Sequence, residues 1–167
     1  MSGAARMRDG VRGEEIVMER LAAMGCQVKP WGLHDDLRAI VGDFATCGLR
    51  WTPDLITYSD NPPFYYGIDV KAPNKSYPNM SVEMSCLKAA DGFALLGVET
   101  IYIDASNFRC CWWKDIDRSN PSTYNNGGSG TPYVLHPHLA MTPIDEFFPL
   151  DAHVLRAYYQ QATTNKE

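Results

Sequence analysis

Hydrophobic residues recur at two spacings along the chain, and the spacing separates helices from strands. Apolar positions repeat at helical intervals before Gly25 and before Gly97, which predicts helices over residues 11–24 and 80–96, with Leu95 among the apolar positions of the second. Shorter runs rich in β-branched and aromatic residues predict strands. The expected strands cover residues 26–29, 54–58, 64–72, 100–105 and 108–113.

Two of these strands are expected to form a hairpin. Residues 59–63 between them consist of Ser, Asp, Asn and two Pro, which are typical turn residues. Along the chain the order is therefore helix, strand, hairpin, helix and two further strands. This order predicts an α/β fold with a mixed central β-sheet flanked by helices.

The composition is that of a folded domain. Hydrophobic residues make up 45% of the 167 residues and charged residues 21%, so the chain has enough apolar material for a core. We expect one domain over residues 1–167, with a flexible arm at 1–10, a flexible Gly-, Asn- and Ser-rich loop at 119–131 and a helical C-terminal tail at 143–167. No apolar run reaches about 18 residues, and no signal peptide is evident. We therefore expect a cytoplasmic protein without a membrane partner.

The net charge limits where nucleic acid can bind. The chain carries a net charge of −5 and has a pI of about 5.3, so a nucleic-acid site would need a local basic patch on an acidic body. The candidates for such a patch are Arg6, Arg8, Arg12, Lys29, Lys71, Lys75 and Lys88. The alternative is that these residues are ordinary solvated charges on the surface.

The predicted strand over residues 64–72 carries two charges among aromatic and β-branched residues. Asp is a poor strand former, and Asp69 and Lys71 project from the same face because side chains alternate along a strand. One interpretation is an ion pair on an edge strand facing water. The other is an acid and a base retained for chemistry, since charges are costly to desolvate without partners.

The preceding strand favours chemistry. It opens with Pro53 and Asp54, and the hairpin brings Asp54 toward Asp69. Two carboxylates near a lysine form an oxygen-rich pocket of the kind that Mg²⁺ prefers. A bound cation would lower the pKa of water and polarise a phosphate. Lys71 would orient the nucleophile or offset the charge that grows on the phosphate.

Glu14 is a third candidate. At 3.6 residues per turn it lies within about 60° of the apolar stripe of the first helix, whereas Glu15 falls on nearly the opposite side. A carboxylate on the buried edge of a helix fits a metal site. The alternative is a Glu near the helix N-terminus that the helix dipole favours, and this applies to both residues.

These elements resemble PD-(D/E)XK nucleases. The segments G-E-E-I-V-M-E-R-L-A-A-M-G (13–25), P-D-L-I-T-Y (53–58) and I-D-V-K-A (68–72), followed by the second helix, occur in the order seen in that superfamily. The pattern is most similar to archaeal-type Holliday junction resolvases and their phage relatives. In those proteins a first-helix Glu stands eleven residues before a Gly, as Glu14 does before Gly25.

The resemblance spans residues 10–115 and implies a restriction-endonuclease-like three-layer core. These resolvases are generally basic, whereas this chain is acidic, and residues 33–50 and the tail after residue 118 have no counterpart in the pattern. The implied site has Glu14, Asp54, Asp69 and the Val70 main-chain carbonyl as metal ligands, Lys71 as a catalytic residue beside the three acids, and Ser85 or Lys88 as an accessory residue.

The leading hypothesis is an endonuclease that hydrolyses DNA phosphodiester bonds with Mg²⁺ or Mn²⁺. Branched DNA, such as a Holliday junction, is the preferred substrate, a homodimer would suit the cutting of two strands, and the host would be a bacterial, archaeal or phage-infected cell. The alternative is an inactive nuclease-like module that binds nucleic acid or protein, which the acidic pI favours. A third reading is a restriction or repair enzyme with sequence or lesion preference.

Overall fold

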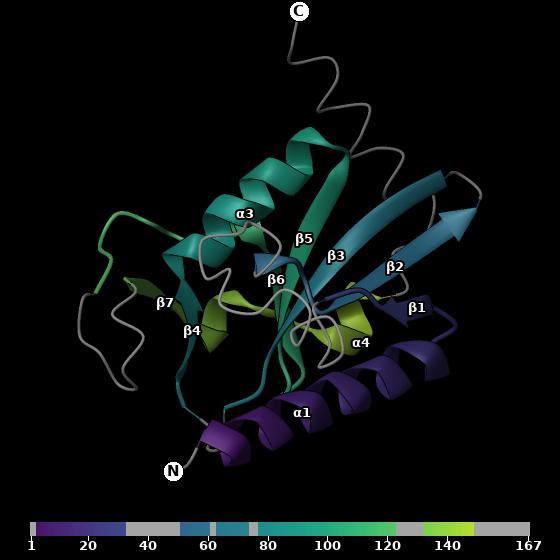
Figure 1. The fold of residues 1–167 in the computed structure, drawn as a ribbon, viewed down its shortest axis with the longest axis horizontal. Helices are drawn as coiled ribbons and strands as arrows, with labels where there is room; N and C mark the ends of the chain where they lie inside the picture. Colours follow the sequence, from purple (N-terminus) through teal and green to yellow (C-terminus); the bar gives the residue numbers. More distant parts are fainter. Residues whose placement is uncertain (1–2, 33–50, 61–62, 74–76, 123–131, 149–167) are drawn as a thin grey trace, which may run out of the picture.

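A six-stranded mixed sheet organises the fold (Figure 1). The structure, a computed structural model, describes residues 3–32, 51–60, 63–73, 77–122 and 132–148, so the predictions made for the intervening segments and for 149–167 lie outside the described residues. The strands, in order across the sheet, are β1 (Gln27–Pro30), β2 (Leu55–Asp60), β3 (Pro63–Lys71), β5 (Val98–Asp104), β6 (Arg109–Trp112) and β8 (Thr142–Pro143).

The predicted hairpin and the mixed sheet are both confirmed. β2 and β3 pair in antiparallel register from Leu55 opposite Ile68 to Asp60 opposite Pro63. β3 and β5 are parallel, while all the other neighbouring pairs of this sheet are antiparallel. The helix α3 (Met84–Leu95) lies in the connection between the two parallel strands, where a crossover is required.

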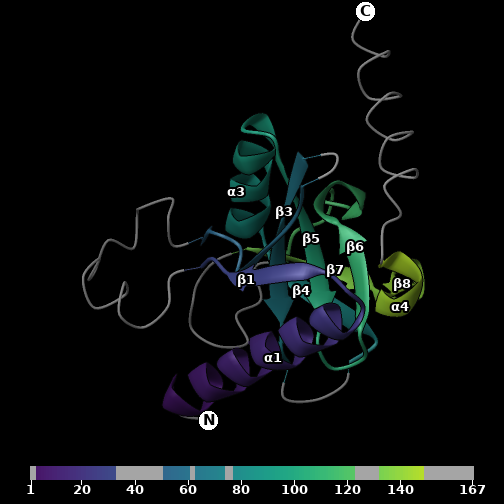
Figure 2. The same cartoon turned by 90° about the vertical axis from the view of Figure 1, so that its right-hand side faces the viewer.

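Each face of the sheet carries its own hydrophobic core. Strand alternation places Ile101 in a core with Val17 of α1 (Gly3–Ala23), while its neighbour Tyr102 belongs to the core that contains Leu87 of α3. Figures 1 and 2 show α1 crossing the lower end of the sheet and α3 lying beside β5. The layers are therefore helix, sheet and helix, which confirms the predicted three-layer α/β fold with a mixed central sheet.

The helix predicted over residues 80–96 is shorter than expected. Its first residues form β4 (Asn79–Glu83), which pairs antiparallel with β7 (Tyr133–Pro137) in a second, two-stranded sheet. Buried and exposed residues alternate along β4, which is the period of a strand. The prediction was wrong here because the pairing partner is distant in the sequence and β7 was not recognised.

The first helix is longer than predicted and covers most of the segment expected to be an arm. α1 begins at Gly3, because the Ala, Arg and Met residues that follow are strong helix formers. The helix ends at Ala23, and Gly25 adopts a positive φ of 85° after it, as expected for a helix stop. Three short elements complete the described chain: the 3₁₀ turns η2 (Trp113–Asp115) and η3 (His138–Ala140) and the helix α4 (Ile144–Phe147).

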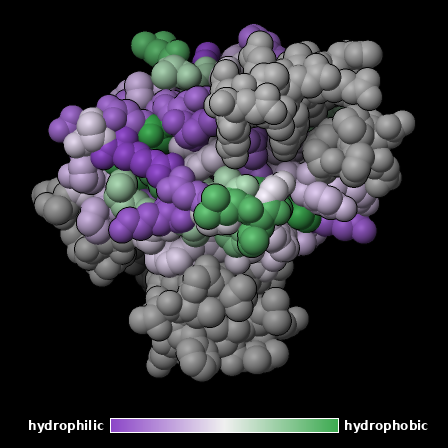
Figure 3. Space-filling model, turned by 90° about the horizontal axis from the view of Figure 1, so that it is seen from above, coloured by the Kyte–Doolittle hydropathy of each residue, from purple (hydrophilic) through white to green (hydrophobic). Residues whose placement is uncertain are grey.

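Two leucines at the end of α3 lie outside both cores. Leu95 and Leu96 are 89% and 79% exposed, so the assignment of Leu95 to an apolar face was wrong. Gly97, with a φ of 84°, ends the helix directly after them. Seen from above, hydrophobic side chains gather among hydrophilic ones on the surface (Figure 3). No helix in the described ranges is long and apolar enough to cross a membrane.

Candidate active site

Asp54 and Asp69 lie side by side at one end of the β2–β3 hairpin. Because Leu55 pairs with Ile68, Asp54 and Asp69 are the next positions of the same register. The Asp54 carboxylate also accepts a hydrogen bond from the Val70 N–H at 2.7 Å. The structure thus brings together the two acids that the sequence placed on neighbouring strands.

Asp69 and Lys71 form a shielded ion pair in the middle of the sheet. Lys71 Nζ lies 2.5 Å from Asp69 Oδ1, and only 24% and 10% of the two side chains are exposed. The interpretation as an edge-strand pair facing water is therefore wrong. The contact lacks hydrogen-bond geometry, and Asp69 Oδ1 has no hydrogen-bond donor among the described residues. The Lys71 ammonium offsets the charge of this oxygen but leaves its hydrogen-bonding capacity unused, and a bound cation would complete its coordination.

Lys71 has two further neighbours on the α3 side of the sheet. Its Nζ lies 5.5 Å from the ring centroid of Tyr102 and 4.0 Å from Cys86 Sγ. Burial by itself lowers the pKa of Lys71, but the Asp69 carboxylate and the other nearby groups outweigh burial and raise this pKa well above its ordinary value. Lys71 is consequently a permanent ammonium ion at neutral pH.

Asp54 is held in an environment that disfavours its charged form. Burial and the neighbouring Asp69 carboxylate raise the pKa of Asp54 to about 7, against the opposing effects of Lys71 and the Val70 hydrogen bond. Near neutral pH a proton and a metal ion would therefore compete for this carboxylate. A site that needs more positive charge than its own side chains supply is suited to a divalent cation.

Glu14 approaches this cluster from α1. Glu14 is half-buried and its charge contributes to the raised pKa of Asp54, whereas Glu15 is exposed, in agreement with the helical spacing. Gly13 allows the close approach, because a Cβ at this position would lie 2.4 Å from the Ala72 Cβ just after β3. The glycine before Glu14 thus sets the distance between the helix and the strand that carries Asp69.

The backbone of Asp54 is held by the segment that follows β1. The amides of Trp31 and Gly32 donate to the Asp54 carbonyl at 2.9 and 3.0 Å. Gly67 leaves room for this packing, since a Cβ there would lie 2.7 Å from Pro53 and 3.3 Å from the Trp31 ring. Trp31, Gly32 and Gly67 were not among the predicted site residues. A glycine inside a predicted strand was the one signal available.

The oxygen atoms available to a cation lie on one edge of β3. The Val70 N–H points to Asp54, while the Lys71 carbonyl accepts from the Ala105 amide on the opposite side, so strand alternation directs the Val70 carbonyl toward Asp54 and Asp69. In the described part of the chain no three His, Cys, Asp or Glu side chains form a ready metal cage. Mg²⁺ suits such an open site, because it keeps several waters and needs only one or two carboxylates.

The two accessory candidates on α3 occupy different environments. Lys88 is exposed, whereas Ser85 is half-buried and its hydroxyl has no hydrogen-bond partner within the described ranges. The α3 residue that contacts Lys71 is Cys86. Sequence reasoning missed Cys86 and Tyr102, since both read as ordinary core residues.

The fold is similar to that of a Holliday junction resolvase. No family model matches the sequence, and no curated protein matches it. Among solved structures, the chain is similar to the 1.6 Å structure of Archaeoglobus fulgidus Hjc, a Holliday junction resolvase from an archaeal hyperthermophile, with a TM-score of 0.52 and 14% sequence identity over 83% of this chain and 93% of that chain. At this identity the likeness shows the fold alone.

Proposed function

We propose that this chain is an endonuclease that hydrolyses phosphodiester bonds in DNA with Mg²⁺ or Mn²⁺. The observation that carries the proposal is the gathering of Asp54, Asp69 and Lys71 at one end of the β2–β3 hairpin, in the order typical of PD-(D/E)XK nucleases. The fold shared with a protein named as a Holliday junction resolvase supports branched DNA as the first substrate to test.

The proposed roles follow from the position of each group. Asp54, Asp69 and the Val70 carbonyl would hold the cation, with Glu14 as the third acid. When bound, the cation would polarise the scissile phosphate and lower the pKa of the attacking water. Lys71 keeps its proton at neutral pH, so it acts by its charge, which offsets the negative charge growing on the phosphate.

The surface formed by Tyr65, Tyr58 and Lys29 beside the acids is suited to bind DNA. Tyr65 is 50% exposed and, being four residues before Asp69 on β3, projects from the same face of the sheet. Its ring stacks on Tyr58 with centroids 6.4 Å apart, and Lys29 Nζ lies 6.0 Å from the Tyr58 ring. The exposed Tyr65 ring and the Lys29 ammonium can contact bases and phosphates.

The test is a cleavage assay on a panel of four-way, flap, nicked and linear DNA, with Mg²⁺ or with EDTA. We expect Mg²⁺-dependent cleavage that is strongest on the four-way junction and falls by about a thousandfold in Asp69→Asn. Cleavage that persists in Asp69→Asn would rule out this site. Tight DNA binding by wild-type protein without any cleavage would instead identify a nuclease-like binding module.

Two neighbouring acids on α1 provide a matched control. Glu14→Gln should reduce cleavage and weaken Mn²⁺ binding, because Glu14 is half-buried beside Asp54. Glu15→Gln makes the same chemical change at an exposed position and should leave both unchanged. Equal effects of the two substitutions would exclude Glu14 from the site. Sedimentation analysis with and without junction DNA tests the proposed homodimer.

A further inference from the structure

The ring of Tyr102 lies directly beside the acid and the base of the candidate site. In the parallel register of β3 and β5, Tyr102 is the partner of Asp69. Its side chain is 1% exposed and faces the α3 side of the sheet, as Asp69 and Lys71 do. The Lys71 ammonium lies 5.5 Å from the centroid of this ring.

We propose that Tyr102 is a positioning residue, whose ring face holds the Lys71 ammonium where the cleavage reaction needs it. The inference deepens the proposed nuclease function and rests on it. An ammonium ion is attracted to the negative face of an aromatic ring, and an aliphatic side chain of similar volume does not offer this attraction.

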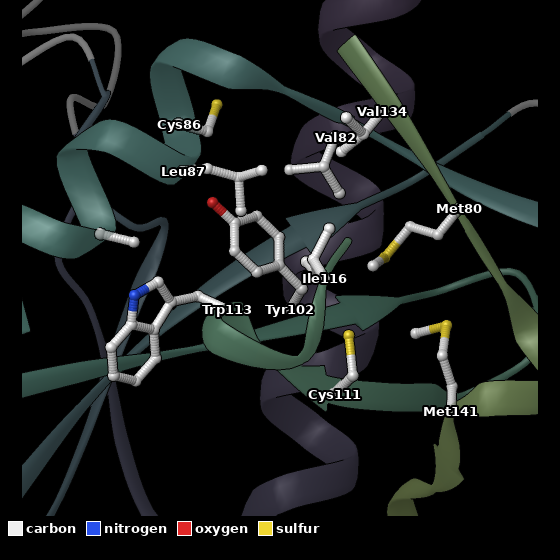
Figure 4. Packing of buried hydrophobic residues seen from close by; sticks show 11 residues of the cluster. Met80, Val82, Cys86, Leu87, Tyr102, Cys111, Trp113, Ile116, Val134 and Met141 are labelled. Carbon is white, nitrogen blue, oxygen red and sulfur yellow. The ribbon is translucent and has the colours of Figure 1, made fainter. Parts of the chain in front are cut away.

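The packing around Tyr102 keeps its ring in place. Figure 4 shows the Tyr102 side chain between Leu87 and Ile116, with its hydroxyl directed toward α3, where Cys86 lies. A ring enclosed on several sides cannot turn away from the lysine. The Lys71 ammonium therefore lies against a ring whose orientation is fixed by packing.

Support from a ring differs from support by a carboxylate. The ion pair between Lys71 and Asp69 uses a carboxylate oxygen that the proposed cation also needs. The ring contact uses none of the metal ligands, so it holds Lys71 without competing for them. Lys71 Nζ also lies 4.0 Å from Cys86 Sγ. This contact is weaker than the ring contact, and it too leaves the proposed metal ligands free for the cation.

The chain offers a matched control in Tyr66. Tyr66 is buried to the same extent, 1% exposed, but belongs to the core on the α1 side of the sheet and packs against Trp112 with ring centroids 5.4 Å apart. Tyr66→Leu and Tyr102→Leu should therefore cause similar losses of stability, while only Tyr102 faces Lys71.

The experiment compares Tyr102→Leu, Tyr102→Phe and Tyr66→Leu at a temperature where all are folded. Single-turnover cleavage of junction DNA is measured at saturating Mg²⁺, and DNA binding is measured separately in Ca²⁺. We expect Tyr102→Leu to lower the cleavage rate about tenfold with unchanged DNA affinity, Tyr102→Phe to recover most of that rate, and Tyr66→Leu to cleave nearly as the wild type. A rate loss shared by Tyr66→Leu, or a loss in Tyr102→Phe as large as in Tyr102→Leu, overturns the proposal.

Two further measurements test the proposal if a leucine variant does not fold or if the wild-type protein does not cleave DNA. Fluorinated phenylalanines at position 102 keep the ring shape and weaken its negative face stepwise, so the cleavage rate should fall with each added fluorine, and a flat series overturns the proposal. The ring current of Tyr102 should also shift the NMR signals of the Lys71 ε-protons, and this shift should vanish in Tyr102→Leu. If the wild type cuts no DNA, the proposed function fails, while the NMR shift still decides whether the ring holds the lysine.

Discussion

The two faces of β3 are made by alternate residues of one strand, and they differ in what stabilises them. On the α1 side, Tyr66 and Ile68 are buried in a core of apolar residues. On the α3 side, Asp69 and Lys71 are shielded by Tyr102 and satisfy each other only in part. The first face supplies stability, while the second holds charges whose burial is costly without partners. Such a contrast is typical of functional sites, where charged residues are buried at a cost in stability and the apolar core elsewhere compensates for that cost.

The sharpest test of this contrast substitutes one face at a time. Ile68→Ala should lower the free energy of unfolding by about 3 kcal/mol and leave cleavage intact at low temperature. The double variant Asp69→Asn, Lys71→Met should lower cleavage by about a thousandfold or more and leave stability unchanged or raised, because a buried ion pair is replaced by neutral groups. Urea unfolding and single-turnover cleavage measure the two effects. A large stability loss in the double variant would contradict the division between the faces.

The approach of α1 to the site can be tested with two glycines of the same helix. Gly13→Ala should lower stability by about 1–3 kcal/mol and weaken Mn²⁺ binding, since the new methyl group would collide with Ala72 and displace Glu14. Gly10 has open space around it, so Gly10→Ala should raise stability by about 0.5–1 kcal/mol. Urea denaturation and Mn²⁺ titration distinguish the two. Normal metal binding in Gly13→Ala would argue against a role for the helix position.

The raised pKa of Asp54 predicts a pH dependence of the metal-free protein. In the folded chain Asp54 keeps its proton up to about pH 7. In the unfolded chain the carboxyl has its ordinary pKa of 3.8 and loses the proton at lower pH. Stability without metal should therefore fall as the pH rises from about 4 to about 7. Asp54→Asn should remove this fall and stabilise the metal-free protein at pH 8 by about 1–3 kcal/mol. Unfolding curves in EDTA at pH 5 and pH 8 provide the measurement, and an Asn variant with an unchanged pH profile would refute the assignment.

The smallest expected effect concerns DNA contact on the open part of the α3 side. Lys29→Ala should weaken junction DNA binding by about two- to fivefold, because Lys29 lies near the Tyr58 ring on the face that carries the acids. Lys114→Ala removes another exposed lysine beside an aromatic ring, 5.6 Å from Trp112, and should have no such effect. Fluorescence anisotropy in Ca²⁺ measures both affinities. The same loss in both variants would indicate a general charge effect in place of a defined surface.

Much of the local structure was predictable because it depends on residues close together in the sequence. The turn formers at 59–63 predicted the hairpin, and its register brings Asp54 beside Asp69. Alternation along β3 placed Asp69 and Lys71 on one face, and the helical period separated half-buried Glu14 from exposed Glu15. These patterns act over a few residues, so the sequence carries them without knowledge of the fold.

The remaining features depend on segments that meet only after folding. The pattern of β4 was read as the start of a helix, because its partner β7 lies far along the chain. The contacts of Tyr102 and Cys86 with Lys71, and the crossing at Gly13, likewise leave no local signature.

The sequence by itself therefore determined the hairpin, the faces of its strands and the acids and base that they carry. Only the tertiary structure decided which ring supports the lysine, which helix reaches the acids and how deeply the charges are buried. The physical reason is that periodicity and turn chemistry are local properties of the chain, whereas burial and long-range contacts arise from how the layers pack together.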